Sequence, residues 1–141
     1  MLDLVLAAAV AANPAFDGKV VPKVQDEIAA ACGASPPISV MWSDFGDDES
    51  GAGALAASGL AFVGTAFTTV CKDSALKTEV GKQISKVVLR QAHGATDPTL
   101  YISKGTLFIE YLWVATEPAP DAAFVARELT DRLRGGEPEA P

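Results

Sequence analysis

The sequence predicts a small α+β domain with a roughly three-stranded antiparallel sheet, made of one strand and a C-terminal hairpin, packed by about four to five helices. Its 141 residues fit one domain. A hydrophobic content of 49% with 21% charged residues is typical of a globular chain that buries a core. Helix-period and strand-period stretches alternate without an internal repeat. We assign residues 1–134 to this domain and residues 135–141, rich in Gly, Pro and Glu, to a polar tail.

The first part of the chain predicts two helices. Residues 2–12 carry apolar side chains at helical spacing and end at Asn13-Pro14. Residues 21–32 repeat this pattern, and Gly33 stands where a glycine cap ends a helix. The apolar start is also similar to a secretory signal, but no Lys or Arg precedes Lys19. We therefore expect residues 2–12 to form a helix of the mature protein rather than a cleaved signal.

One strand and one ambiguous segment follow. Residues 38–42 alternate as a strand does, and residues 43–50 have the composition of a loop. Residues 53–72 carry an apolar stripe at helical spacing, whereas Gly59, Gly64 and a Thr-rich run favour a strand. We expect a buried, central helix whose glycines let another backbone approach closely.

The later part of the chain predicts a helix, a hairpin and a last helix. Residues 75–92 form the clearest helical stripe, with Asp73 or Ser74 as the cap at its start and Gly94 at its end. Two β-rich runs, 99–103 and 106–113, are separated only by Lys104-Gly105, which is typical of a hairpin. Asp121 then precedes a helical stripe that Gly135-Gly136 ends.

The charge of the chain excludes several partners. The net charge is −7, and the basic residues are scattered singly rather than gathered on one face. Nucleic acids and anionic membrane surfaces both require a basic patch, so we expect neither. We expect a protein partner instead, either a second copy of this chain or a client protein, and acidic charge would steer a basic partner toward it.

No catalytic constellation is visible. The single histidine, His93, lies at the end of a predicted helix, where it suits the helix dipole. Cys32 and Cys71 read as small buried hydrophobic residues, with a disulfide between them left open, and they are too few for a zinc site. We predict no cofactor, no metal and a cytoplasmic location.

An acidic loop is the strongest candidate for an ion site. Asp44, Asp47, Asp48 and Glu49 are closely spaced, and carboxylates are ligands for Ca²⁺ and Mg²⁺. Their spacing does not match a calcium-binding EF-hand loop. A solvated loop is therefore the favoured interpretation.

The aromatic side chains of the hairpin suggest an interface. Tyr101, Phe108, Tyr111 and Trp113 lie on the two predicted strands, and Phe108 points opposite to Tyr111 and Trp113. A sheet with one uncovered apolar face is typical of a binding surface. The leading prediction is thus a non-enzymatic interaction module. A small-molecule-binding domain is the alternative, followed by a small enzyme.

Overall fold

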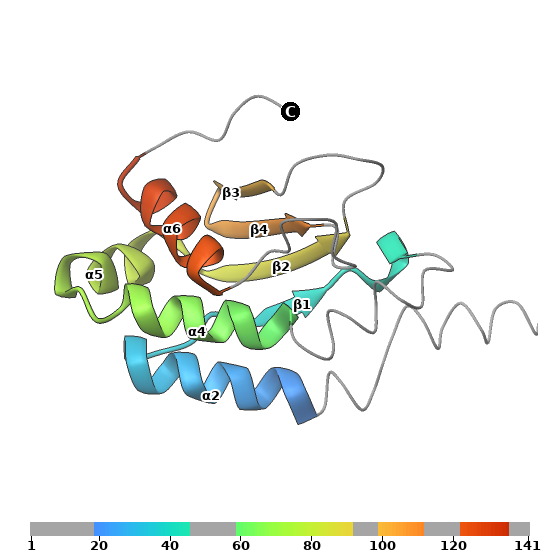
Figure 1. The fold of residues 1–141 in the computed structure, drawn as a ribbon, viewed down its shortest axis with the longest axis horizontal. Coiled ribbons are helices and arrows are strands. Elements are labelled where there is room, and N and C mark those ends of the chain that lie inside the picture. The colour runs from blue at the N-terminus through green and yellow to red at the C-terminus, as the bar shows by residue number, and fades with distance from the viewer. Residues whose placement is uncertain (1–18, 46–58, 92–98, 112–121, 136–141) are drawn as a thin grey trace, which may run out of the picture.

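The computed structural model describes residues 19–45, 59–91, 99–111 and 122–135, and these form a mixed α/β arrangement (Figure 1). Within these residues there are four α-helices and one four-stranded sheet. The helices are α2 (Val21–Cys32), α4 (Leu60–Val70), α5 (Ser74–Gln83) and α6 (Ala122–Leu133). The strands are β1 (Ile38–Val40), β2 (Lys86–Gln91), β3 (Thr99–Ser103) and β4 (Thr106–Tyr111), and a short 3-10 helix, η2 (Trp42–Phe45), follows β1.

The sheet is mixed and its strand order is β1-β2-β4-β3. β1, β2 and β4 run parallel to one another, and β3 runs antiparallel to β4 at the edge. A parallel connection between β1 and β2 requires a long crossover, and α4 and α5 lie within it. The described residues therefore confirm an α+β fold, but the predicted three-stranded antiparallel sheet is wrong.

The source of the error is the segment predicted as one helix over residues 75–92. The helix α5 ends at Gln83, Ile84 is already extended, and residues 86–91 form β2 in the middle of the sheet. Leu76, Val80 and Ile84 repeat every four residues as in a helix. After them, Val87 and Leu89 alternate as in a strand, and both are fully buried. Hydrogen bonding to β1 on one side and β4 on the other decides this conformation.

The described helices pack on one face of the sheet (Figure 1). Helix α4 lies between α2 and α6 and contacts both of them. The core between the layers contains fully buried side chains from both, among them Leu60, Phe67, Leu107 and Ile109. In β4 the buried residues Leu107 and Ile109 alternate with half-buried residues that face away from the helices. In β2, Val87, Val88 and Leu89 are buried in succession, so Val88 is only 6% exposed although it faces away from the helices.

Several local predictions are confirmed. Helix α2 has the predicted bounds, and Gly33 ends it in the left-handed conformation with φ of 88°. Asp73 caps α5 by accepting hydrogen bonds from the N–H groups of Ala75 and Leu76. At the hairpin, Lys104 and Gly105 have φ of 50° and 83°, so both central residues are left-handed as in a type I′ turn.

In the described part of the ambiguous segment 53–72, residues 60–70 form the helix α4, as predicted, and the packing explains the glycine at position 64. A Cβ atom at Gly64 would lie 2.9 Å from Cγ1 of Val24 in α2. The close neighbour is thus a side chain rather than the backbone that we expected. Its absent side chain lets α4 approach α2 closely.

Some predictions lie outside the described residues. These are the N-terminal helix 2–12, the residues of the tail beyond Gly135, and the end of the second hairpin strand at residues 112–113. In the described part of the chain, no helix has both the length and the apolar character that crossing a membrane requires.

Candidate functional site

The candidate site is the face of the sheet opposite the helices, which we call the helix-free face. By strand alternation its side chains include Val88 and Arg90 of β2, Phe108 and Glu110 of β4, and Tyr101 of β3. The register aligns Val88, Phe108 and Tyr101 in one row across the three strands. Arg90 and Glu110 are aligned in the next row, near the carboxyl ends of β2 and β4.

Two of the four predicted interface residues meet on this face. The rings of Tyr101 and Phe108 are stacked, with centroids 5.0 Å apart and planes inclined by 19°. Both side chains are half-buried. The side chain of Tyr111 and the whole of Trp113 lie outside what the structure describes.

A polar network runs beside the aromatic pair and joins η2, β2 and the β3–β4 hairpin, which are distant from one another in the sequence. Nε of Arg90 donates to Oδ2 of Asp44 at 2.9 Å, and Nη2 donates to Oδ1 at 3.3 Å. Nη1 of Arg90 lies 3.5 Å from Oε1 of Glu110. The hydroxyl of Tyr101 donates to the same Oε1 at 3.0 Å. The order Asp44, Arg90, Glu110, Tyr101 thus connects η2, β2, β4 and β3.

The network changes the proton affinity of two of its members. The hydrogen bond to Asp44 raises the pKa of Arg90, with further contributions from the charges of Asp44 and Glu110. Burial raises the pKa of the Tyr101 phenol, and the hydrogen bond to Glu110 adds to this effect. Arg90 is therefore held as a cation and Tyr101 as a neutral hydrogen-bond donor.

Asp44 was the first residue of the predicted acidic site, and its role in the structure differs from that of a metal ligand. Both of its carboxylate oxygens accept hydrogen bonds from Arg90. Asp47, Asp48 and the histidine at position 93 lie outside the described residues. Among the residues that are described, no group of three or more His, Cys, Asp or Glu is placed to hold a metal ion.

Arg90 and Glu110 are functional candidates that the sequence analysis missed. Arg90 lies within the segment 75–92 that was predicted as a helix, and Glu110 was not singled out. Their pairing follows from the alignment of the segments KVVLRQ and TLFIEY as neighbouring parallel strands, which places Arg90 beside Glu110. The sequence signal that could have revealed the pair is that Arg90 and Glu110 each stand at the fifth position of these two apolar runs.

At the β3 edge of the sheet, one backbone carbonyl group already has a hydrogen-bond partner from a helix. Nε of Arg132, in α6, donates to the carbonyl oxygen of Leu100 in the edge strand β3 at 3.0 Å. The Arg132 side chain is only 8% exposed and also pairs with Asp131 and Glu128. A carbonyl that would accept from an added strand is therefore already satisfied.

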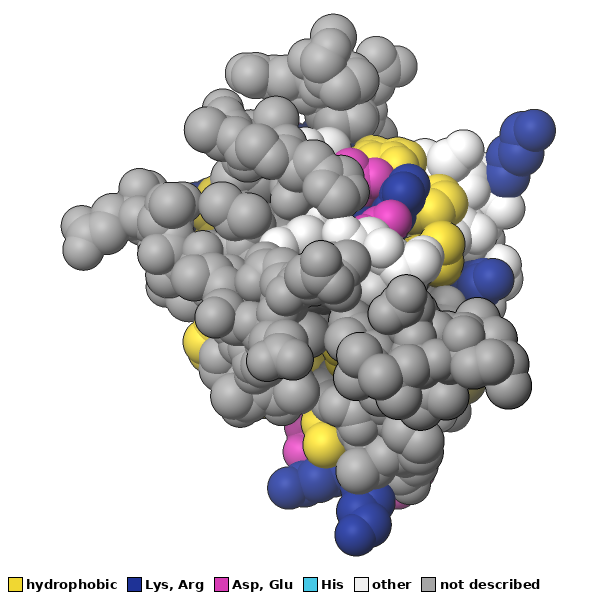
Figure 2. Space-filling model, turned by 90° about the vertical axis from the view of Figure 1, so that its right-hand side faces the viewer, with side chains coloured by type: hydrophobic (Ala, Val, Ile, Leu, Met, Phe, Trp, Pro, Cys, Tyr) yellow, Lys and Arg dark blue, Asp and Glu magenta, His cyan; other side chains and the backbone are white. Residues whose placement is uncertain are grey.

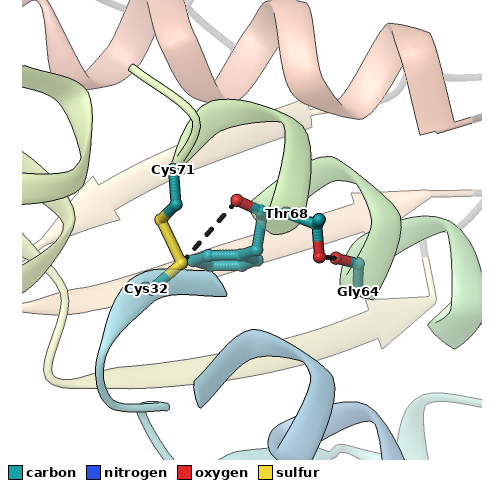
Figure 3. The surroundings of a disulfide bond; sticks show 5 residues. Cys32, Gly64, Thr68 and Cys71 are labelled. Atoms are coloured by element: carbon teal, nitrogen blue, oxygen red, sulfur yellow. Dashed lines mark hydrogen bonds between the residues drawn. A yellow bond between two sulfur atoms is a disulfide. The ribbon is translucent and has the colours of Figure 1, made fainter. Parts of the chain in front are cut away.

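A disulfide joins Cys32 and Cys71 on the helical side of the molecule (Figure 3). It connects the last residue of α2 to the residue after α4, with 5.3 Å between the Cα atoms. Sγ of Cys32 also lies 3.7 Å from the carbonyl oxygen of Phe67. The disulfide that the sequence left open therefore fastens α2 to the central helix.

Figure 2 shows the side of the molecule toward which β2 and β4 point in Figure 1. Acidic and basic side chains meet there beside a group of hydrophobic side chains.

No protein-family model, no curated protein and no solved structure matches this chain.

Proposed function

We propose that this protein is a non-enzymatic interaction module that binds a protein partner through its helix-free face. The partner is a second copy of the chain or a client protein. The observation that supports this most directly is the stacked, half-buried pair of Tyr101 and Phe108 beside the Arg90–Glu110 pair. Aromatic residues next to arginine are the side chains most enriched at the centres of protein interfaces.

The topology of the sheet supports the same proposal. Three of its four strands are parallel, and parallel strands are normally covered on both faces. The described helices cover one face only. A partner on the other face would complete the usual layer arrangement.

The sheet edge is a weaker candidate for the docking surface. Strand addition at β3 needs its outward carbonyl groups, and Arg132 already binds the one at Leu100. Strand β1 at the opposite edge has only three residues. Both features are typical of edges that are protected from pairing.

The test compares two variants in the host of the protein. Phe108→Lys places a charge on the helix-free face, and Ala30→Lys places the same charge on the exposed side of α2. After cross-linking in cells, we expect at least one protein, or a second copy of the chain, to be captured by the wild type and by Ala30→Lys but not by Phe108→Lys. Far-ultraviolet circular dichroism verifies that both variants fold. Equal capture by both folded variants would refute the proposal.

The location of the protein enters the proposal through the disulfide. Cysteines in the cytosol are kept reduced, and structural disulfides persist mainly in oxidising compartments. The predicted cytoplasmic location stays a prediction, and the Cys32–Cys71 bond favours an oxidising compartment over it. Counting free thiols in protein alkylated at the moment of cell lysis separates the two locations.

A further inference from the structure

The charges of the polar network do not cancel. Among the described residues of the network, Asp44 and Glu110 each carry a negative charge, and Arg90, which lies between them, carries a positive charge. Arg90 is closer to Asp44, at 2.9 Å and 3.3 Å, than to Glu110, at 3.5 Å. The residual negative charge therefore resides mainly on Glu110, whose side chain is 28% exposed.

Glu110 also retains acceptor capacity. The contacts that the described residues make with its carboxylate all use Oε1, which receives Tyr101 and faces Arg90. An ionised carboxylate has about four acceptor positions on its two oxygens. Oε2 is thus available to a donor that approaches from outside the molecule.

The aromatic pair lies immediately beside this carboxylate. Phe108 is two residues before Glu110 on the same side of β4, and Tyr101 is stacked on it. Half-buried aromatic rings next to a carboxylate suit the side chains of arginine and lysine. Their apolar stems pack on rings, their charge is attracted to the ring face, and their donors bind oxygen.

The size of the face indicates what kind of segment carries this cation. The strands range from three residues in β1 to six in β2 and β4, and about 3.3 Å per residue with about 4.8 Å between strands gives the face about 320 Å². Part of this area is already covered, since Val88 is only 6% exposed. A stable contact between two folded domains buries about 800 Å² on each partner. The face is therefore better matched to a short peptide segment than to a second folded copy.

We infer that the helix-free face binds a short segment of a partner protein through an arginine or lysine side chain, with its charged group on Glu110 and its stem on Phe108 and Tyr101. This inference rests on the proposed function and names the chemistry of the partner. The overall net charge of −7 favours the approach of such a basic segment.

The test titrates the isotope-labelled full chain with two dipeptides, acetyl-Phe-Arg-amide and acetyl-Phe-Gln-amide, and follows backbone amide chemical shifts. We expect the arginine peptide to shift amides of β3 and β4 and to bind about fivefold more tightly than the glutamine peptide. That ratio is the size expected for one half-exposed ion pair. In Glu110→Gln, which keeps an acceptor for Tyr101, the two peptides should bind equally.

The outcomes separate this inference from the proposed function. If both peptides bind wild type equally, or shift residues elsewhere, the basic segment is refuted, and the partner capture that depends on Phe108 is unaffected. If the amides of β3 and β4 shift on dilution of the protein alone, a second copy occupies the face and the inference is overturned. If Phe108→Lys leaves capture in cells unchanged, both proposals fail.

Discussion

Asp44 and Arg90 are 46 residues apart in the chain and are joined by two hydrogen bonds. The pair fastens η2, which follows β1, to the far end of β2. We expect Asp44→Asn to lower the free energy of unfolding by about 1 kcal/mol, because hydrogen bonds to charged groups contribute about 1.5–3 kcal/mol and partial exposure of Arg90 screens them. Urea unfolding measures this change. Asp26→Asn, on the exposed side of α2, is the control, and equal losses in the two variants would contradict the prediction.

Gly64 makes the contact between α4 and α2 sensitive to one added methyl group. The Cβ of Gly64→Ala would lie 2.9 Å from Cγ1 of Val24, so the Val24 side chain or one of the two helices must shift. We expect a loss of about 1–3 kcal/mol in the free energy of unfolding. Adding Val24→Ala to this variant creates room, and the double variant should lose less than the sum of the two single changes.

Gly81 is the matched control for this experiment. It lies in α5, and a Cβ at this position would meet no atom within 4 Å. Alanine is a better helix former than glycine, so Gly81→Ala should raise the free energy of unfolding by about 0.5–1 kcal/mol. Opposite signs for the two Gly→Ala changes in urea unfolding are expected. A lower free energy of unfolding in both variants would contradict the prediction that Gly81 is free of close contacts and that only Gly64 is needed for packing.

The disulfide should stabilise the fold strongly, because Cys32 and Cys71 are 39 residues apart. For a loop of this length the chain-entropy relation gives about 4 kcal/mol. We expect a reducing agent to lower the urea midpoint of the wild type. The double variant Cys32→Ala, Cys71→Ala should start at the lower midpoint and should not respond to the reducing agent. A wild type that is indifferent to reduction would contradict the prediction.

Tyr101 should make stability fall at high pH. Its pKa in the folded protein is raised above the ordinary value of 10.0, first by burial and then by the hydrogen bond to Glu110. Below pH 10.0 the phenol is neutral in both states, and its contribution to stability is fully present. As the pH rises through the folded pKa, the unfolded state loses its proton more readily and this contribution disappears.

Tyr101→Phe separates this effect from other titrations. The chain has two tyrosines, so the difference in tyrosinate absorbance between wild type and Tyr101→Phe reports Tyr101. We expect that difference to appear above pH 10.0, and the variant to lose less stability than the wild type over the same interval. Ionisation of Tyr101 at or below its ordinary pKa would be inconsistent with the network.

Sequence patterns predicted correctly those elements whose signals are local. The apolar stripe and Gly33 define α2, the side chain of Asp73 begins α5, and Lys104-Gly105 closes the hairpin. Each of these depends on residues within a few positions of one another. The physical reason is that capping, helical spacing and tight turns require no distant partner.

The conformation of residues 86–91, and with it the site, depends on contacts with distant parts of the chain. Val87, Val88 and Leu89 fit a buried helix or a buried strand equally well, because a short apolar run does not distinguish the two. Pairing with β1 and β4 makes this run a central strand and turns an antiparallel sheet into a mixed one. The same pairing brings Arg90 beside Glu110 and within reach of Asp44. Contacts across such sequence distances are set by the packing of the whole chain.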